Sequence, residues 1–520
     1  MALVMRRGGN IVEFGRRVGT LPNGRPLTAP LPKDVEDRFK SELTYDHLHQ
    51  LRGVDAYDSF GSYRPTRTER KELFLIGDDG HFNASVGWQA RLLRISRQMG
   101  HAVEVVDLDP PHPRPNRFDA DWDRLFDVMD LRVKQDEILA AMETADRGIL
   151  DLPPAVGKTF LIAAYCLAHP NARVHVVTDG IDVLNRIHDH LVKYISNVGR
   201  VGGGRRKFGT RVTVISADSL HVVGEGFDDP RAASSPDVVI FDEVHKAAAT
   251  TILDQVRKYQ RCRVYGLSGS VNMRHDKADH QLEGIFGEVV YSMTYQEAEE
   301  LKLVAPVRVE WVMMDFEAPH LTNLDGHMLE KEGVWRNDER NRRFADRMNQ
   351  FGPDVQCLVM VSKFEHAVQM KQFLPDYKLC YADAKDHARY VRSGLLDPAD
   401  EPVMTPHRRE QMRQQFEAGT LKKVISTDVW STGVDFAALS VLCRADARGS
   451  AIMDTQIPCR ANRVHRGKEY ALVIDGMDLF NDKLLGRSNS RKRNYVKKGW
   501  SIEGLSTKRI GVLAARMNRR

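Results

Sequence analysis

The sequence predicts an α/β protein with two parallel-sheet domains in tandem, a small N-terminal α/β domain and a basic C-terminal tail. From about residue 130, short β-branched strands alternate with helical segments, and the alternation continues to about residue 475. Such alternation is typical of parallel sheets that are covered by helices. About five predicted strands lie on either side of a break near Ala305 and Pro306. Two doubly wound domains are the simplest fold that accounts for both observations.

The composition is that of a globular protein with several domains. The chain has 520 residues, of which 42% are hydrophobic and 28% are charged, and this length predicts about three to four domains. Its six cysteines are isolated, which argues against a disulfide framework or a structural zinc site and favours a reducing compartment. No apolar run approaches the roughly 18 residues of a membrane span, and the apolar start is too short for a signal peptide. We therefore expect a cytoplasmic protein.

Positive charge is concentrated near the C-terminus. The whole chain carries 76 Lys and Arg against 71 Asp and Glu, a net charge of +5. From Leu485 onward there are 11 basic residues and one acid, Glu503, so this segment carries +10 and the remainder carries −5. A basic segment on a mildly acidic body favours a polyanionic partner such as nucleic acid. A solvated terminal tail without a partner is the alternative.

The N-terminal part divides into an unpatterned segment and a small predicted domain. Residues 1–65 contain many Gly and Pro, which predicts an extended or disordered extension. Residues 66–115 predict a β-α-β accessory domain that could contact DNA. Its expected elements are a strand at 72–77, a helix at 85–100 and a strand at 102–108.

The two larger domains are expected over 130–305 and 306–482, and a basic tail is expected over 483–520. Each predicted strand is short, apolar and β-branched, and helical segments separate the strands. Strands of the first domain are predicted at 148–152, 172–178, 211–216, 237–243 and 262–268. Strands of the second are predicted at 307–314, 356–361, 422–427, 440–445 and 470–476.

A Gly-Lys-Thr turn between a strand and an apolar helix predicts a phosphate-binding loop. Backbone N–H groups of such a turn surround phosphates, the lysine reaches the β- and γ-phosphates, and the threonine hydroxyl binds Mg²⁺. The residues expected to hold the nucleotide are Pro154, Ala155, Val156, Gly157, Lys158 and Thr159. The full pattern would place glycine where this chain has Leu152. An isolated Gly-Lys-Thr is weak evidence, and its place between a strand and a helix strengthens it.

Two carboxylates follow a buried strand about 85 residues after this loop. The segment PDVVIFDEVHKAAA delivers Asp242 and Glu243 directly after four apolar residues. A buried parallel strand places them at the sheet edge where the phosphate loop also lies. Asp242 would hold Mg²⁺, and Glu243 would position and deprotonate the attacking water. We interpret His245 as a sensor that couples the nucleotide to neighbouring segments. An acidic cap after a strand is the alternative.

These motifs resemble those of superfamily 2 helicases of the DExH-box type. The segment GLSGS at 266–270 resembles the Ser/Thr-Ala-Thr motif, which links ATP hydrolysis to nucleic-acid binding. The segment TDVWSTGVD at 427–435 resembles motif V, and QIPCRANR at 456–463 resembles motif VI. Gln135, 23 residues before Lys158, resembles the glutamine that reads adenine. The order and spacing match from about Arg132 to Asp475.

Within the superfamily, GLSGS followed by FGEVVY is most similar to UvsW-type bacteriophage helicases, which are relatives of XPB-like and type III restriction motors. The resemblance implies two RecA-like domains that bind ATP and Mg²⁺ in a cleft, and a phage origin in a bacterial host cytoplasm. Two departures stand out, because Ala155 and Cys459 each occupy a position where the family has glycine.

The resemblance also implies roles for individual residues. Arg463 is the expected arginine finger and Arg460 the second candidate, while Gln456 would lie near the γ-phosphate. Asp435 would contact ribose, and Gly433 would permit close backbone approach. The residues expected to couple hydrolysis to nucleic-acid binding are His245, Ser268 and Ser270.

Nucleic acid is expected to cross both domains through backbone contacts. Thr178, Ser216 and Thr427 each follow a predicted strand and could donate to phosphate, although short polar residues there are also ordinary turn formers. The segment GGGRRK at 202–207 is either a basic loop that touches DNA or a surface loop without a partner. Trp430 could stack on a base, but packing between the domains is the favoured interpretation.

The main functional hypothesis is an ATP-dependent DNA helicase or translocase that remodels branched DNA or RNA–DNA hybrids in phage replication and recombination. A clamp that binds nucleic acid under ATP control and turns over slowly is the first alternative, because of Ala155 and Cys459. An RNA helicase is the second, since the core motifs contact backbone.

Overall fold

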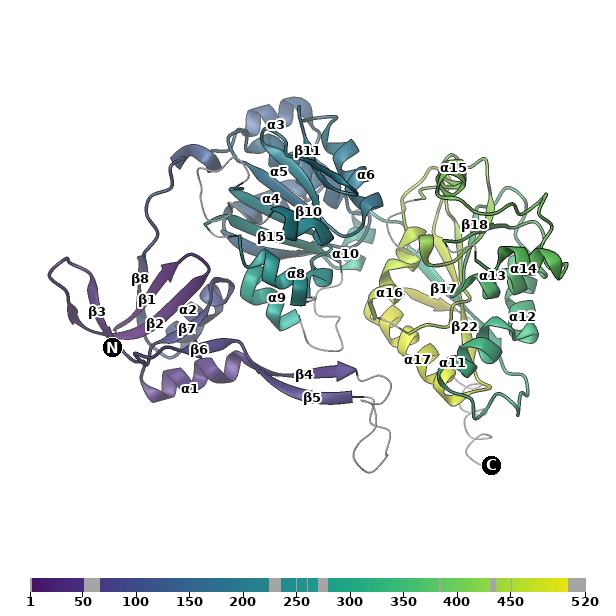
Figure 1. Ribbon diagram of the computed structural model, residues 1–520, viewed down its shortest axis with the longest axis horizontal. Coiled ribbons are helices and arrows are strands. Elements are labelled where there is room, and N and C mark those ends of the chain that lie inside the picture. The colour runs from purple at the N-terminus through teal and green to yellow at the C-terminus, as the bar shows by residue number, and fades with distance from the viewer. Residues whose placement is uncertain are drawn as a thin grey trace. The chain divides into compact units, whose positions relative to one another are not determined.

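The computed structural model describes residues 2–50, 66–223, 235–248, 250–259, 261–269, 279–382, 385–430, 436–449 and 451–503. The chain forms two compact units (Figure 1). Unit 1 comprises Met1–Pro153 and Gly157–Met293, and unit 2 comprises Thr294–Arg520 with the loop residues Pro154–Val156. Each unit contains one large parallel sheet, so the predicted fold class is confirmed.

Unit 1 begins with a small mixed sheet whose strand order is β6-β7-β2-β1-β8, with β3 paired to β2. Its strands are β1 (Ala2–Gly8), β2 (Ile11–Thr20), β3 (Pro26–Ala29), β6 (Phe74–Ile76), β7 (Phe82–Ser85) and β8 (Ala102–Asp107). The helices α1 (Lys33–Glu42) and α2 (Gln89–Gln98) accompany it. Buried rings of Phe14, Phe39 and Phe82 meet edge to face in its core.

The prediction of an unpatterned extension over 1–65 is wrong for residues 2–50, which form strands and a helix. The glycine and proline residues that suggested disorder belong to a hairpin turn, where Gly24 has a φ of +81° and donates its N–H to the Leu21 carbonyl. The predicted β-α-β order also differs, because β8 pairs in parallel with β1 and not with a strand near residue 72. The accessory domain therefore needs the first residues of the chain.

A separate two-stranded ribbon extends from this domain (Figure 1). It consists of β4 (Thr44–Gln50) and β5 (Thr66–Glu72), which pair antiparallel from Thr44 opposite Glu72 to Gln50 opposite Thr66. Two-stranded sheets are marginally stable by themselves in water. The ribbon therefore depends on what its base contacts.

The large sheet of unit 1 has the order β12-β11-β13-β10-β14-β15-β9-β16, and all its pairings are parallel except β11 with β12. The strands are β9 (Arg147–Asp151), β10 (Val174–Thr178), β11 (Gly199–Gly202), β12 (Arg205–Lys207), β13 (Val212–Ser216), β14 (Val238–Asp242), β15 (Arg263–Ser268) and β16 (Val289–Ser292). Every residue of β10, β13 and β14 is buried, as the continuous apolar runs predict for central parallel strands.

Helices and short turns connect the strands of unit 1. They are η2 (Val86–Trp88), η3 (Pro115–Phe118), α3 (Trp122–Val128), α4 (Gln135–Glu143), α5 (Lys158–Ala168), α6 (Ile181–Leu191), η4 (Ala217–Ser219), α7 (Leu220–Val223), η5 (Val244–Ala248), α8 (Thr250–Val256) and α9 (Asp279–Phe286). Eight consecutive buried residues, from Leu161 to Ala168, explain why α5 is apolar on all sides.

Unit 2 holds a parallel sheet with the order β19-β20-β18-β21-β22-β17-β23. The strands are β17 (Val307–Met314), β18 (Cys357–Met360), β19 (Lys378–Cys380), β20 (Lys423–Ser426), β21 (Val441–Arg444), β22 (Ala471–Asp478) and β23 (Ser501–Glu503). Unit 2 begins at Thr294, before the break predicted near Pro306, and its first helix, α10 (Tyr295–Glu300), starts with a capping box between Thr294 and Glu297.

The helical elements of unit 2 follow the same alternating pattern. After α10 come α11 (Gly326–Met328), the π-helix η6 (Leu329–Trp335), α12 (Asp338–Met348), α13 (Phe364–Lys371), α14 (His387–Arg392), α15 (Pro406–Glu417), η7 (Asp428–Trp430), α16 (Ala451–Gln456), η8 (Pro458–Arg460) and α17 (Asp482–Lys497). Among the described residues, no helix combines the length and the apolar character that a membrane span requires.

The basic tail predicted over 483–520 is structured as far as residue 503, and residues 504–520 lie outside the described chain. In α17, Leu484, Ser488, Arg491 and Tyr495 are buried on one side of the helix. Arg491 forms a fully buried ion pair with Asp475 at 2.9 Å. The tail prediction is therefore wrong for α17, because it counted Arg491 as a solvated charge when it is part of the core.

Candidate active site

The phosphate loop and the acidic pair lie at one edge of the sheet in unit 1. Asp242 at the end of β14 pairs in register with Leu267 of β15, and Ser268 pairs with Asp151 at the end of β9. The loop that follows β9 therefore begins at the same edge where Asp242 ends its strand. Parallel strands produce this convergence, since all their carboxyl ends point the same way.

The loop has the backbone shape that its glycine predicts. Gly157 has a φ of +96° and is the N-cap residue of α5. The Leu161 N–H donates to the Gly157 carbonyl at 3.0 Å, which is the first hydrogen bond of the helix. Ala155 also has a positive φ, +76°. The left-handed conformation costs about 1–2 kcal/mol for a residue with a Cβ atom. The alanine thus occupies a position suited to glycine.

Gln135 lies against this loop. Its side chain is 1% exposed, and its Oε1 atom accepts a hydrogen bond from the Arg132 backbone N–H at 2.9 Å. A Cβ atom added at Gly157 would come within 3.0 Å of Gln135 Nε2. The structure therefore brings together the predicted adenine-reading glutamine and the phosphate loop, and it explains why the loop has glycine at this point.

Lys158 and Glu243 form an ion pair across this edge. Lys158 Nζ donates to Glu243 Oε1 at 3.0 Å, and both side chains are mostly buried. Lys158 is the first residue of α5, and Glu243 directly follows β14 with a φ of +55°. The predicted phosphate-binding lysine and the predicted base are therefore direct neighbours.

His245 connects Glu243 to the end of β15. Its Nδ1 atom lies 3.4 Å from Glu243 Oε2 and 2.8 Å from Ser268 Oγ. His245 is 2% exposed and Ser268 is fully buried. A Cβ atom added at Gly266 would lie 2.8 Å from Val244, so this glycine allows η5 to approach β15 closely. The structure thus builds a continuous chain from Lys158 to Ser268.

Asp242 and Thr159 are the predicted metal ligands. Asp242 is 8% exposed at the end of β14, and Thr159 lies in the first turn of α5. A carboxylate and a hydroxyl are hard oxygen donors, which suit Mg²⁺ when substrate phosphates and water complete its shell. Among the described residues, no group of three or more His, Cys, Asp or Glu could hold a metal alone.

Thr178 and Ser216, predicted to contact nucleic acid, are register partners at the ends of β10 and β13. Each is 1% exposed, and a Cβ atom added at Gly202 would lie 2.9 Å from the Ser216 Cβ atom. Both residues therefore lie beneath the surface in the described structure. The segment 202–207 forms the turn and second strand of the β11–β12 hairpin.

In unit 2, the two candidates for the arginine finger lie in different elements. Gln456 ends α16 and is 7% exposed, Arg460 lies in the 3-10 turn η8, and Arg463 lies in the loop that follows. Between them, fully buried Asn462 donates to Tyr295 Oη at 3.1 Å, and its carbonyl accepts from the Ala305 N–H. Sequence reasoning missed Asn462, because one asparagine between arginines carries no periodic signal.

Trp430 packs inside unit 2. It is 2% exposed, and its ring centroid lies 5.2 Å from that of Phe416 and 4.9 Å from that of Phe436. Its buried ring leaves no face open for base stacking, and packing between the domains stays a prediction. Thr427, just before η7, is 8% exposed and donates its N–H to the Cys380 carbonyl. Gly433, Asp435 and Ser270 lie outside the described residues.

A buried charge network ties α16 to α17, and sequence reasoning missed it. Arg444 contacts Asp454 of α16 at 2.7 Å, and Asn494 of α17 donates to the same carboxylate at 2.8 Å. Tyr495 Oη donates to Asp475 at 2.8 Å and accepts from Arg444 at 3.1 Å. Burial raises the pKa of Tyr495 well above its ordinary value, and the neighbouring Asp475 and Asp454 carboxylates raise it further.

Two family models match this chain. The model described as type III restriction enzyme, res subunit, matches residues 128–272, and the helicase conserved C-terminal domain matches residues 344–466. The first match contains the phosphate loop and the acidic pair, and the second contains the predicted motifs V and VI. No curated protein matches the sequence.

Solved structures with a similar fold include two restriction enzymes. An ATP-dependent type ISP restriction-modification enzyme, LlaBIII bound to DNA, matches 79% of this chain and 32% of its own length at 13% identity and a TM-score of 0.51. A fragment of an HsdR subunit of a type I restriction enzyme from Vibrio vulnificus YJ016 matches 84% of this chain and 87% of its own at 14% identity and 0.50. UvsW from T4 aligns over 96% of this chain and 98% of its own at 14% identity, with a TM-score of 0.39.

Proposed function

Because the chain is a superfamily 2 helicase-type protein related to restriction motors, we propose that it is a DNA-dependent ATPase that translocates on or unwinds DNA. Its substrates in this proposal are branched DNA or RNA–DNA hybrids, in phage replication and recombination. The supporting observation is the continuous chain from Lys158 through Glu243 and His245 to Ser268.

The ion pair between Lys158 and Glu243 suits a switch that responds to nucleotide. Phosphate oxygens of ATP compete for Lys158, and its departure leaves Glu243 able to orient and deprotonate water. Asp242 and Thr159 would hold Mg²⁺, which neutralises charge on the phosphates. Gln135 beside Gly157 suits recognition of adenine.

The predicted arginine residues complete the proposal for hydrolysis. An arginine that reaches the γ-phosphoryl group stabilises the charge that develops there, which is worth about 10³–10⁵ in rate. Arg463 remains the first candidate and Arg460 the second. Asn462, buried between them in the sequence, anchors the segment that joins Arg460 to Arg463 by its hydrogen bond to Tyr295.

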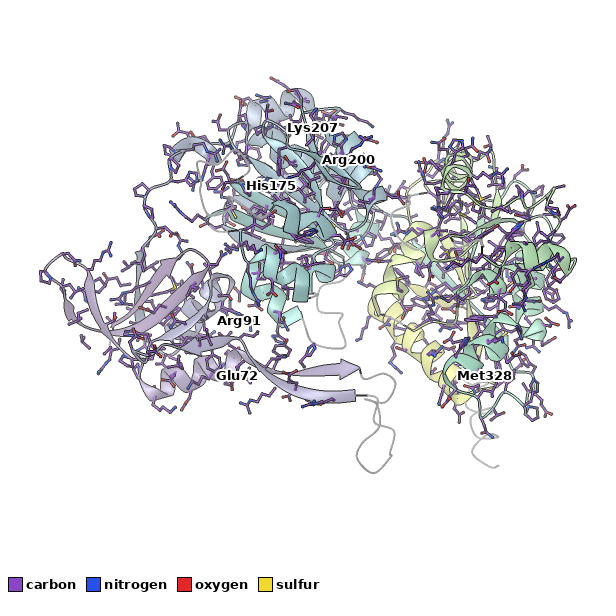
Figure 2. All side chains as sticks on the ribbon, in the orientation of Figure 1. Glu72, Arg91, His175, Arg200, Lys207 and Met328 are labelled. Atoms are coloured by element: carbon purple, nitrogen blue, oxygen red, sulfur yellow. The ribbon has the colours of Figure 1, made fainter. Side chains whose placement is uncertain are left out.

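The β11–β12 hairpin supports a nucleic-acid partner. The side chains of Arg205, Arg206 and Lys207 in β12 are exposed. Arg200 of β11 lies opposite Lys207 in the same hairpin (Figure 2). Within the described part of the chain, none of these four side chains forms an ion pair. Unpaired cations on a twisted ribbon suit phosphate contacts that do not read sequence. This agrees with a motor that moves along backbone.

The slow clamp is the second candidate function, and one observation favours it. Ala155 holds a positive φ in the phosphate loop, where strain could slow the conformational cycle. An RNA helicase is the remaining alternative, since backbone contacts alone do not distinguish RNA from DNA.

The deciding experiment measures ATP hydrolysis with no nucleic acid, with single-stranded DNA, with a forked duplex and with RNA of matched length. We expect DNA to stimulate hydrolysis at least about tenfold, and Glu243→Gln to abolish turnover, since general-base catalysis contributes about 10²–10⁴ in rate. A flat response with tight ATP-dependent DNA binding would instead identify the clamp. Stronger stimulation by RNA than by DNA would identify the RNA helicase.

A further inference from the structure

Helix α9 (Asp279–Phe286) lies between the accessory domain and the ATPase residues of unit 1. One side of α9 packs against η5, which carries His245, and another packs against η2 of the accessory domain. Leu282, Ile285 and Phe286 are buried in a core cluster that also contains Val244. A movement of α9 therefore reaches the segment that directly follows Glu243.

Two arginines of α2 form ion pairs with glutamates in α9 and directly after it. Arg91, labelled in Figure 2, donates to both carboxylate oxygens of Glu283, at 2.6 and 2.8 Å, and Arg94 donates to Glu288 at 2.8 Å. The Glu283 side chain is only 13% exposed. A bidentate arginine–carboxylate pair holds both orientation and distance. The pair thus fixes both the distance and the orientation of α9 relative to α2.

Two glycines let the accessory domain approach α9 without intervening side chains. A Cβ atom added at Gly87 of η2 would lie 2.1 Å from the Glu283 carbonyl oxygen. A Cβ atom added at Gly284 would lie 2.8 Å from the Nε1 atom of Trp88, which is 1% exposed. This contact is too close to tolerate even an alanine without displacement.

The base of the two-stranded ribbon also contacts α9. Gln281 donates to Tyr45 Oη at 2.6 Å, and the Tyr45 ring stacks on His280 with centroids 5.2 Å apart. Because an isolated ribbon is marginally stable, its orientation depends on this contact. The ribbon and α2 therefore both act on one short helix.

A cavity of about 350 Å³ runs beside this helix, and its walls include Arg91, Glu283, Val244 and His245. It is continuous from the accessory domain to the histidine that contacts Glu243 and Ser268. Ile149 and Glu288 line the same cavity, and Ile149 of β9 donates its N–H to the Glu288 carbonyl, which links this segment to the strand before the phosphate loop.

From these contacts we infer that α9 couples the accessory domain to the ATPase centre. Nucleic acid that engages the accessory domain repositions α9 through Arg91, Gly87 and the ribbon, and α9 repositions η5 and thereby Glu243. Glu283 and Gly284 are positioning residues in this scheme, since neither touches the reacting atoms. The inference rests on the proposed ATPase function.

The test compares Arg91→Glu, Glu283→Arg and the double variant with Arg97→Glu as a control. Arg97 is exposed on the same helix and contacts no acid among the described residues. We expect each single variant to lose about tenfold of the DNA-stimulated kcat, with KM for ATP and basal hydrolysis unchanged. The double variant restores the pair with reversed polarity and should recover most of the stimulation.

Gly284→Ala tests the same inference independently of the Arg91–Glu283 ion pair. Alanine favours a helix interior over glycine, so a loss of helix propensity cannot explain a defect. The added methyl group displaces the buried Trp88 ring, so the stimulated kcat should fall, and the overpacking should lower the melting temperature by no more than a few degrees. Wild-type stimulation in Arg91→Glu, Glu283→Arg and Gly284→Ala would overturn the inference.

Amide hydrogen exchange distinguishes failure of the coupling from failure of the proposed function. Without nucleotide or DNA, Arg91→Glu should speed exchange in η5 at least about threefold and leave α13 of unit 2 unchanged. Arg97→Glu should change neither segment. Unchanged exchange in η5 overturns the coupling, whereas altered exchange in a chain without ATPase activity overturns only the proposed function.

Discussion

His245 Nδ1 lies 2.8 Å from Ser268 Oγ, and this contact joins the turn after Glu243 to the carboxyl end of β15. Both residues are buried, so water does not compete for the interaction. The contact places Glu243 two side chains from Ser268, in the segment that resembles the Ser/Thr-Ala-Thr motif. In the proposed function, hydrolysis and nucleic-acid binding would therefore be coupled by a short physical route.

Ser268→Ala should uncouple the two activities. Removal of the hydroxyl leaves His245 without one buried partner, which costs about 1–3 kcal/mol. We expect DNA stimulation of ATPase to fall about tenfold while ATP affinity, measured by fluorescent-nucleotide titration, stays within about twofold. Thr213→Val is the matched control, because Thr213 is also buried in a strand of the same sheet and has no predicted role in the site. Equal stimulation in wild type and Ser268→Ala would remove this contact from the coupling route.

Ala155→Gly should stabilise the phosphate loop. Glycine adopts a positive φ without steric cost, whereas alanine pays about 1–2 kcal/mol, and the greater unfolded-state freedom of glycine cancels part of the gain. The expected net change is about +0.5 kcal/mol in the free energy of unfolding of the chain, measured by urea denaturation. Ala164→Gly, inside α5, should instead destabilise. A loss of stability in Ala155→Gly would contradict the strain that the φ of +76° implies.

Arg491→Leu should destabilise unit 2 severely. It leaves the Asp475 carboxylate buried without its arginine partner, and breaking such a pair costs about 3–5 kcal/mol. Chemical denaturation followed by circular dichroism measures the change. Arg493→Ala, on the exposed side of the same helix, should stay within about 0.5 kcal/mol of wild type. If both variants behave alike, α17 is not part of the core of unit 2.

Acid should destabilise unit 2 through His366. Burial, reinforced by the charge of Arg340, lowers the pKa of His366 to about 3. The unfolded chain binds a proton near pH 6.5 and the folded chain does not, so stability is lost as the pH falls below 6.5. The expected loss is about 2 kcal/mol at pH 5. His366→Gln retains an amide donor towards Asn341 and should flatten the dependence, which thermal unfolding between pH 7 and 5 will check.

The local motifs were predictable because their chemistry is contiguous in sequence. Gly157, Lys158 and Thr159 follow a strand, and Glu243 follows another, so strand polarity alone predicts that they share an edge. The pairing of Lys158 with Glu243 follows from the order of β14, β15 and β9, which no local pattern specifies. The proximity of Gln135 to Gly157 likewise depends on where α4 packs relative to the phosphate loop, which the local sequence does not specify.

Distant pairings and buried charges were not predictable. The accessory sheet joins β1 to β8, whose residues lie about 100 positions apart, as Ala2 opposite Ala102 shows. Arg491 resembles its neighbours Lys492 and Arg493 in sequence, and only the position of Asp475 in the fold distinguishes it. Trp430, inside predicted motif V, suggested packing between the domains, with a base contact as the alternative, whereas the structure places its ring against Phe416 and Phe436 of the same unit.

The charge network of unit 2 has a consequence for synthesis of the chain on the ribosome. Asp454 and Asp475 emerge before Arg491, Asn494 and Tyr495, which later surround them. Until α17 leaves the ribosome, these carboxylates have incomplete partners, and β17 lacks its edge neighbour β23. Unit 1 can complete its sheet much earlier, since domains fold as units from the N-terminus. Ribosome stalling before residue 490 should therefore leave a folded ATP-binding half attached to an unfinished second half that chaperones must protect.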